Sequence, residues 1–178
     1  MSSRIWKGIA VIVAVIVLGF VAQRLFGDKT TVGTIQVPDP VAVIGSGEDA
    51  VAVTAGGAVV RWWPLAEAPA LPSLPLAELP KGGHLAGPML QQARVLGAAP
   101  PALRPYLAAS HYGESGVEVE TTSGIELRFG DASQAAQKWK SAATVLADPE
   151  IMALDYVDLS APGKPAYGGS GHTLPPAP

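Results

Sequence analysis

The 178-residue sequence has no cysteine, only three histidines and few charges, since Asp, Glu, Lys and Arg together make up 15% of it. Without cysteine, the chain can form neither a disulfide framework nor a thiolate metal site. The histidines, His84, His111 and His172, fall in loop or tail contexts, and none has a second ligand at helical or hairpin spacing. We therefore predict no metal site and no cofactor.

Other patterns of catalytic residues are also absent. The stretch Gly113–Gly116 lacks the spacing of a nucleophile elbow, and we interpret the residues before it as a loop instead of a buried strand. The segment Gly45–Gly47 is too short for a phosphate loop. Glu118, Glu120 and Glu126 are interpreted as a solvated strand face instead of an acid–base pair. These observations predict a protein that is not an enzyme and has no small-molecule substrate.

The charge distribution argues against nucleic acid as a partner. Between residues 111 and 160 the basic side chains are Arg128, Lys138 and Lys140, and acidic side chains outnumber them. A domain with this balance repels phosphates instead of releasing their counterions. We therefore predict no nucleic-acid binding.

The one long apolar run lies near the N-terminus, where residues 8 to 23 carry no charge. A membrane span needs about 20 apolar residues, and Lys7 and Arg24 can extend this run by snorkelling. A cleaved signal peptide is the alternative, but Phe20 stands where a small residue belongs. We predict an uncleaved anchor whose lipid-facing residues are Ile9, Val11, Ile12, Val13, Val15, Ile16, Val17, Leu18 and Phe20.

The flanking charges predict the orientation of this anchor. Arg4 and Lys7 favour an N-terminus inside the cell, although Arg24 and Lys29 reduce the contrast. The expected organisation is a cytoplasmic N-terminus (1–7), a transmembrane anchor (8–26), a tether (27–34), an extracytoplasmic domain (35–169) and a disordered tail (170–178).

The C-terminal half of the chain contains a compact α+β pattern. Alternating residues between Gly116 and Gly130 predict a β-hairpin. The period then changes, and Ala135, Ala136, Trp139, Ala142, Ala143 and Leu146 recur at helical spacing. Gln137, Lys138, Lys140 and Ser141 are expected on the polar side, with Ser133 or Asp131 as the cap. A further strand is predicted over 154–159, with Trp139 packed against the sheet.

The residues before the hairpin predict more strands and helices. Three β-rich runs are expected between residues 35 and 65, with a turn at 55–57 between the second and the third. The Pro-rich segment 65–83 is expected to cross the surface in extended form. Pro88 should open a helix that ends near Gly97, and a short helix should follow Pro101 with Leu107 on its inner side. The expected fold class is α+β: a single transmembrane helix followed by a mixed or antiparallel sheet with packed helices.

The order of these pieces resembles the β-domain of the FtsQ/DivIB family of bacterial division proteins. The resemblance rests on short motifs in matching order. They are Pro40-Val41-Ala42, a strand pair around a Gly turn between Val51 and Val60, Leu71-Pro72 or Leu79-Pro80, Pro101-Ala102-Leu103-Arg104, the hairpin Gly116–Gly130, Lys138 on the following helix, and Tyr156-Val157-Asp158-Leu159. Members of that family have a POTRA domain between the membrane anchor and the β-domain. This sequence departs from the family there, because the gap between Phe26 and Ile35 is too short for such a domain.

The resemblance implies a non-enzymatic, single-pass inner-membrane protein at the division septum. In that family, the last strand of the β-domain pairs with a strand of FtsB, in a complex that includes FtsL. The corresponding residues here are Ala161, Gly163, Lys164, Ala166, Tyr167 and Gly168. Pro162 and Pro165 cannot donate to such a pairing. The alternative function is a divergent anchored domain that binds another envelope ligand or protein.

Overall fold

The computed structural model describes residues 39–64, 70–76 and 79–174. Within these residues no helix is long and apolar enough to cross a membrane. The predicted cytoplasmic N-terminus (1–7), anchor (8–26) and tether (27–34) all lie outside the described residues.

The first part of the described chain forms a three-stranded antiparallel sheet in the order β1-β2-β3. Its strands are β1 (Pro40–Ile44), β2 (Val51–Thr54) and β3 (Val59–Val60), with a short 3₁₀ turn, η1 (Gly47–Asp49), between the first two. The predicted turn at 55–57 is confirmed. Gly57 has a φ of 84°, which a residue with a side chain rarely adopts, and the Thr54 amide donates to the Ala58 carbonyl at 3.0 Å.

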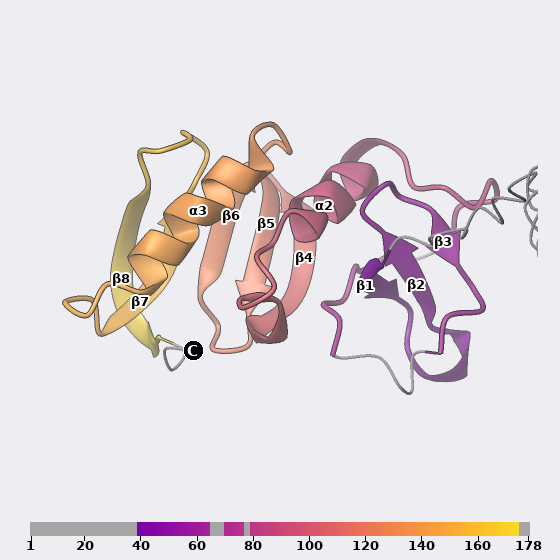
Figure 1. The fold of residues 1–178 in the computed structure, drawn as a ribbon, viewed down its shortest axis with the longest axis horizontal. Helices are drawn as coiled ribbons and strands as arrows, with labels where there is room; N and C mark the ends of the chain where they lie inside the picture. Colours follow the sequence, from indigo (N-terminus) through magenta and orange to yellow (C-terminus); the bar gives the residue numbers. More distant parts are fainter. Residues whose placement is uncertain (1–38, 65–69, 77–78, 175–178) are drawn as a thin grey trace, which may run out of the picture. The chain divides into compact units, whose positions relative to one another are not determined.

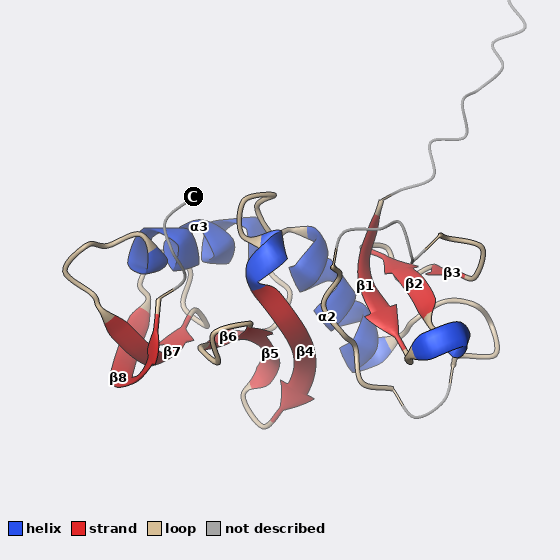
Figure 2. Ribbon diagram, turned by 90° about the horizontal axis from the view of Figure 1, so that it is seen from below, coloured by secondary structure: helices blue, strands red, loops and turns tan. Residues whose placement is uncertain are grey.

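The second part forms a five-stranded mixed sheet in the order β4-β5-β6-β7-β8. Its strands are β4 (Leu107–Gly113), β5 (Gly116–Thr121), β6 (Glu126–Gly130), β7 (Ala153–Asp158) and β8 (Ala166–Thr173). Only the β6–β7 pair is parallel, because the helix α3 (Ala135–Leu146) connects these two strands. The helices α2 (Gly87–Gly97) and α3 lie on the same face of this sheet (Figures 1 and 2). The predicted α+β domain is therefore confirmed.

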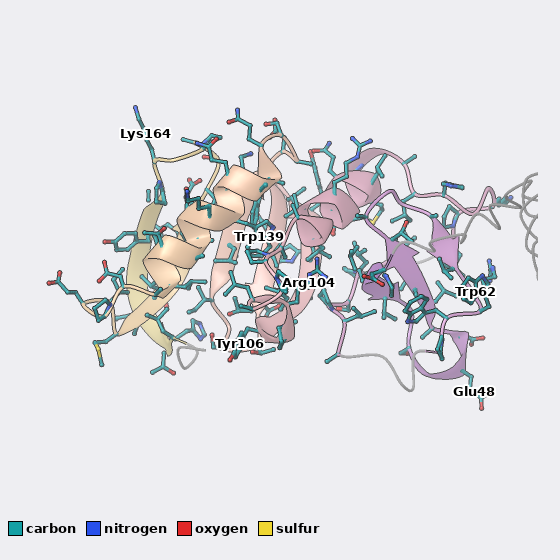
Figure 3. The ribbon with its side chains drawn as sticks, in the orientation of Figure 1. Glu48, Trp62, Arg104, Tyr106, Trp139 and Lys164 are labelled. Atoms are coloured by element: carbon teal, nitrogen blue, oxygen red, sulfur yellow. The ribbon has the colours of Figure 1, made fainter. Side chains whose placement is uncertain are left out.

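The core fills the space between this sheet and the two helices and continues into strands β1 and β2 of the first sheet. The hairpin alternation correctly predicted its inner residues, since Val117, Val119, Leu127 and Phe129 are fully buried. Trp139 is fully buried too, as expected, with its ring centroid 4.7 Å from that of Phe129 (Figure 3). Its indole Nε1–H donates to the Val95 carbonyl of α2 at 2.7 Å. One aromatic side chain thus joins both helices to the sheet.

The predicted polar side of α3 needs a correction at Lys138, which is only 1% exposed. Its ammonium donates to the Phe129 carbonyl at 2.8 Å, and to the Asp131 carbonyl and carboxylate at 3.0 and 2.9 Å. Hydrogen bonds from Ser133 and Lys138 lower the pKa of Asp131 to about 2. The lysine is buried because three oxygens compensate for the lost water.

Other details of α3 also differ from the prediction. Ala136 is exposed and Val145 is buried, so the inner face is rotated relative to the expected stripe. The N-cap is Gln134, at a left-handed φ of 50°, and no side chain caps the helix. Asp131 instead accepts from the amide and hydroxyl of Ser133 at 3.0 and 2.6 Å, which forms a turn before the helix.

Three predictions before the hairpin are wrong. The expected short helix is a single 3₁₀ turn, η2 (Arg104–Tyr106), and Leu107, expected on the inner side of that helix, begins strand β4. The residues before Gly113, expected to form a loop, belong to this strand. Strand β4 shows no apolar alternation because only Leu107 and Ser110 are buried along it. The Pro-rich segment is not confined to the surface either, since Leu74 is 1% exposed and belongs to the core.

The C-terminal boundary is also corrected. We expected the domain to end at residue 169 and a disordered tail to follow, yet β8 continues to Thr173. His172 and Thr173 pair with Leu154 and Ala153 of β7, and Leu174 packs against the core. The Gly-rich sequence of β8 has no apolar alternation, because the strand contributes backbone pairing and few buried side chains.

Candidate partner-binding edge

The five-stranded sheet has two outer strands, and one of them is covered by the Pro-rich segment. Ser73 forms parallel bridges to Ala109 of β4 on one side and to Val43 of β1 on the other. The Ser73 amide donates to the Ala108 carbonyl at 2.9 Å, and the Ser110 amide donates to the Ser73 carbonyl at 2.9 Å. Ser73 therefore joins the two sheets, and its hydrogen bonds occupy the outer side of β4 at Ala108 and Ser110.

Strand β8 is the other outer strand, and among the described residues no strand pairs with its outer side. All of its side chains are exposed or only half-buried. Most are small, and Tyr167 stands out as a large hydrophobic residue with 49% of its surface exposed. An outer strand of this kind presents unpaired backbone groups to solvent. Of the two ends of this sheet, β8 therefore provides the candidate binding edge.

A glycine-rich bulge divides this edge. Tyr156 pairs with Gly168 and Leu154 pairs with His172, so Asp155 alone faces residues 169–171. The Asp155 carboxylate accepts a hydrogen bond from the Gly171 amide at 2.7 Å. A Cβ at Gly169 would occupy the place of this carboxylate, and Gly169 has a φ of 86°. The bulge thus requires glycine for space and for backbone conformation.

The structure separates the six residues predicted for partner binding into two groups. Ala166, Tyr167 and Gly168 form the first half of β8. Ala161, Gly163 and Lys164 lie instead in the turn between β7 and β8, where the Lys164 amide donates to the Ala161 carbonyl at 3.1 Å. The nine residues predicted to face lipid lie outside the described residues.

Sequence reasoning missed the side chains of β7 that lie next to this edge. Tyr156 and Asp158 alternate with the fully buried Val157, so they occupy the face that the helices do not cover. The Arg128 guanidinium stacks on the Tyr156 ring, 4.4 Å from its centroid, and forms an ion pair with Glu126 at 2.8 Å. The strand alternation of 154–159 was visible in the sequence, but the identity of its neighbouring strand was not.

The same open face carries a second side-chain contact farther from β8. His111 of β4 and Glu118 of β5 face each other in the sheet, with the imidazole Nε2 2.8 Å from the carboxylate. His111 was interpreted as an isolated loop histidine, whereas it lies in a strand. The glutamates predicted on a solvated strand face, Glu118, Glu120 and Glu126, do share this open face.

An apolar cavity of about 320 Å³ lies apart from this edge, between β1, residues 70–72 and the turn before β4. Trp63 and Leu71 line it, together with Arg104, whose Nε–H donates to the Ala99 carbonyl at 3.1 Å. The Trp63 ring lies next to that of the exposed Trp62, with ring centroids 6.1 Å apart.

Comparison with known families bears on the whole arrangement. The family described as "Cell division protein FtsQ/DivIB, C-terminal" matches residues 42–160, which is well over half of the chain. The chain belongs to the FtsQ/DivIB family. No curated protein matches it.

The FtsQ/DivIB match extends from within β1 to the residue pair after β7. It therefore includes nearly all of the three-stranded sheet, strands β4 to β7 of the other sheet, the Ser73 joint and the two helices. Strand β8 follows the matched residues, so its role has to be argued from its geometry in this chain.

Proposed function

We propose that this FtsQ/DivIB protein is a non-enzymatic scaffold of the division septum that binds an FtsB-like partner, within a complex including an FtsL-like protein, by strand addition to β8. The proposal rests on a difference between the outer backbone groups of the two outer strands. Hydrogen bonds to Ser73 occupy the outer backbone groups of Ala108 and Ser110 in β4, whereas no strand covers β8 within the described residues. A partner strand can bond to the free backbone groups of such an edge.

The first half of β8 is the preferred place for this partner. Tyr167 lies opposite Val157 in the pairing of β7 with β8. Because Val157 is buried under the helices, the Tyr167 side chain lies on the same helix-covered face, at the margin of the core. A half-exposed tyrosine at an edge offers a large contact area at low cost in side-chain entropy. Ala161, Gly163 and Lys164 belong to the adjoining turn and are proposed as flanking contacts, while Ala166 and Gly168 contribute backbone.

The proposed topology rests on the sequence. Residues 8–26 form the single anchor, with the N-terminus in the cytoplasm and the domain outside it, at the inner membrane of the septum. A reporter enzyme that works only outside the cytoplasm, fused after Pro178, should be active. Activity of a cytoplasm-only reporter at the same position contradicts this topology.

Binding is tested with a matched pair of tyrosines on the two outer strands. Tyr167→Ala should weaken binding of an FtsB-like partner by about 1–3 kcal/mol, a range typical of interface anchors. Tyr112→Ala is the control, because Tyr112 is 44% exposed on β4, the outer strand that Ser73 joins to the first sheet. Both variants should unfold within about 0.5 kcal/mol of wild type, as expected for exposed positions.

The measurement is calorimetric titration of the full chain in detergent with the FtsB-like partner, alongside urea unfolding. Equal binding by wild type and both tyrosine variants excludes β8 as the anchor. Recovery of unrelated envelope components, with no division protein, from an envelope extract favours the alternative of a different envelope ligand.

A further inference from the structure

The open face of β8 has a gap beside Tyr167. The two residues that flank Tyr167 are Ala166, whose side chain is a methyl group, and Gly168, which has no side chain. A Cβ built at Gly168 would lie 3.2 Å from the Tyr156 hydroxyl, so the tyrosine of β7 extends over this glycine. Gly168 lies opposite Tyr156 in the pairing of β7 with β8, and Ala166 lies opposite Asp158. An added strand would therefore meet two polar groups of β7 across the small residues of β8.

The charge at this gap is negative. The Asp158 carboxylate accepts a hydrogen bond from the Ser160 amide at 2.9 Å. Hydrogen bonding from the Ser160 side chain, then from its amide, and the nearby Arg128 lower the pKa of Asp158, so the carboxylate is ionised at neutral pH. The positive charge of Arg128 is already engaged by Glu126 and by the Tyr156 ring. An incoming cation would find an ionised acceptor beside a hydroxyl group.

The usable length of the edge is short. Pro165 has no amide hydrogen to donate, and it immediately precedes Ala166. On the other side, the bulge held by Asp155 interrupts the strand from Gly169 onward. The window between these limits is Ala166–Gly168. Three residues provide few backbone bonds, so side-chain contacts must provide much of the specificity.

We infer, on the basis of the proposed function, that β8 selects a short partner strand with a lysine or arginine that reaches Asp158 and the Tyr156 hydroxyl across Gly168, next to an apolar residue beside Tyr167. Neighbouring residues of a strand point to opposite faces, so the basic and apolar side chains are adjacent in the partner sequence.

The absence of cysteine permits a direct test. Lys164→Cys places a single thiol in the turn before the window, where disulfide exchange can capture peptides that carry a cysteine (Figure 3). The probes are strand peptides with a central valine flanked by lysine, glutamine or glutamate. A fourth peptide, with proline in place of the valine, cannot pair as a strand. The full chain in detergent is used, and captured fractions are measured by mass spectrometry.

We expect the lysine peptide to be captured on the order of threefold better than the glutamine peptide at low salt, with the glutamate peptide captured least, because exposed ion pairs are individually weak. The preference should shrink in 0.5 M salt, which shortens the screening length to below about 5 Å. Asp158→Asn should remove it while keeping an acceptor for the Ser160 amide. Gly168→Ala should reduce it by filling the gap.

Glu120→Gln is the matched control, since it neutralises a carboxylate on the same face but on β5, three strands from β8. It should leave the lysine preference unchanged. Capture of all strand peptides at the level of the proline peptide means that the edge accepts no strand, which overturns the proposed function. Strand peptides captured above that level, but without a lysine preference that depends on Asp158, overturn only the present inference.

Discussion

The outer strands β4 and β8 end the same sheet and yet differ in what lies beyond them. Ser73 bonds to the backbone of β4 on both sides of Ala109 and continues the hydrogen bonding to β1. Strand β8 has no such neighbour among the described residues, and it carries a bulge instead. Both strands also hold a half-exposed tyrosine, Tyr112 or Tyr167. The tyrosines are therefore similar, and the state of the backbone distinguishes the two edges.

This difference shows two ways in which a sheet can manage its ends. An exposed strand invites pairing with other chains unless it is covered, shortened or distorted. A Pro-rich segment covers β4, although that segment has no strand periodicity of its own. Strand β8 is distorted by three closely spaced glycines around Asp155, which leaves a short regular stretch next to Tyr167. The first device joins two parts of the domain, and the second leaves room for a partner.

The largest effect on stability should come from Trp139, which joins both helices to the sheet. Trp139→Ala removes a fully buried ring and the bond to Val95 that joins α3 to α2. We expect a loss of about 3–5 kcal/mol in the free energy of unfolding, as for other buried aromatic truncations. Urea unfolding measures it. Trp139→Phe, which keeps most of the apolar area, should cost clearly less. A loss below about 1 kcal/mol would show that this ring does not hold the helices together.

The covered edge can be opened with one residue. Ser73→Pro removes the amide that donates to Ala108, and it should cost about 1–3 kcal/mol, the penalty for an unsatisfied buried backbone group. The exposed side of β4 should then associate with other copies, which sedimentation at increasing protein concentration detects. Ser73→Ala serves as the control, because it keeps every backbone hydrogen bond and changes only an exposed side chain. A monomeric proline variant with wild-type stability would contradict the role of this joint.

The open edge should be sensitive at its bulge, with a smaller effect. Gly169→Ala places a Cβ where the Asp155 carboxylate lies and strains a φ of 86°. The expected cost is about 1–2 kcal/mol, within the range for a strained backbone position. Gly82→Ala is the control, since a Cβ there meets nothing within 4 Å. Faster hydrogen exchange of the Gly171 amide should accompany the loss of stability. Unchanged exchange would mean that the hydrogen bond from the Gly171 amide to Asp155 survives.

The parts of the fold that could be predicted are those whose side chains report their burial. Alternation in the hairpin and the helical spacing around Trp139 follow from a one-sided core, so β5, β6, α3 and β7 were anticipated with small boundary shifts. Lys138 was misplaced because a single sequence cannot show that three oxygens surround an ammonium group. Its position on the helix predicts only which way it points.

The parts that could not be predicted are held by backbone bonds. Strands β4 and β8 and the Ser73 joint bury few side chains, so their sequences carry little periodicity. The same limit applies to the candidate site. Tyr167 and the edge position were anticipated from the family resemblance. The contributions of Asp155, Tyr156 and Asp158 depend on the register between β7 and β8, which no local pattern specifies.

The Ser73 joint also has a consequence for the order of events during folding. Hairpins such as β5–β6 close short loops, whereas Ser73 meets partners that lie some thirty residues away in either direction. Loop closure entropy and contact order both disfavour early formation of such contacts. We therefore expect a newly made domain to pass through an interval with two open sheet ends. In pulse-labelled hydrogen exchange, its signature is later protection of the Ser110 amide than of Val119.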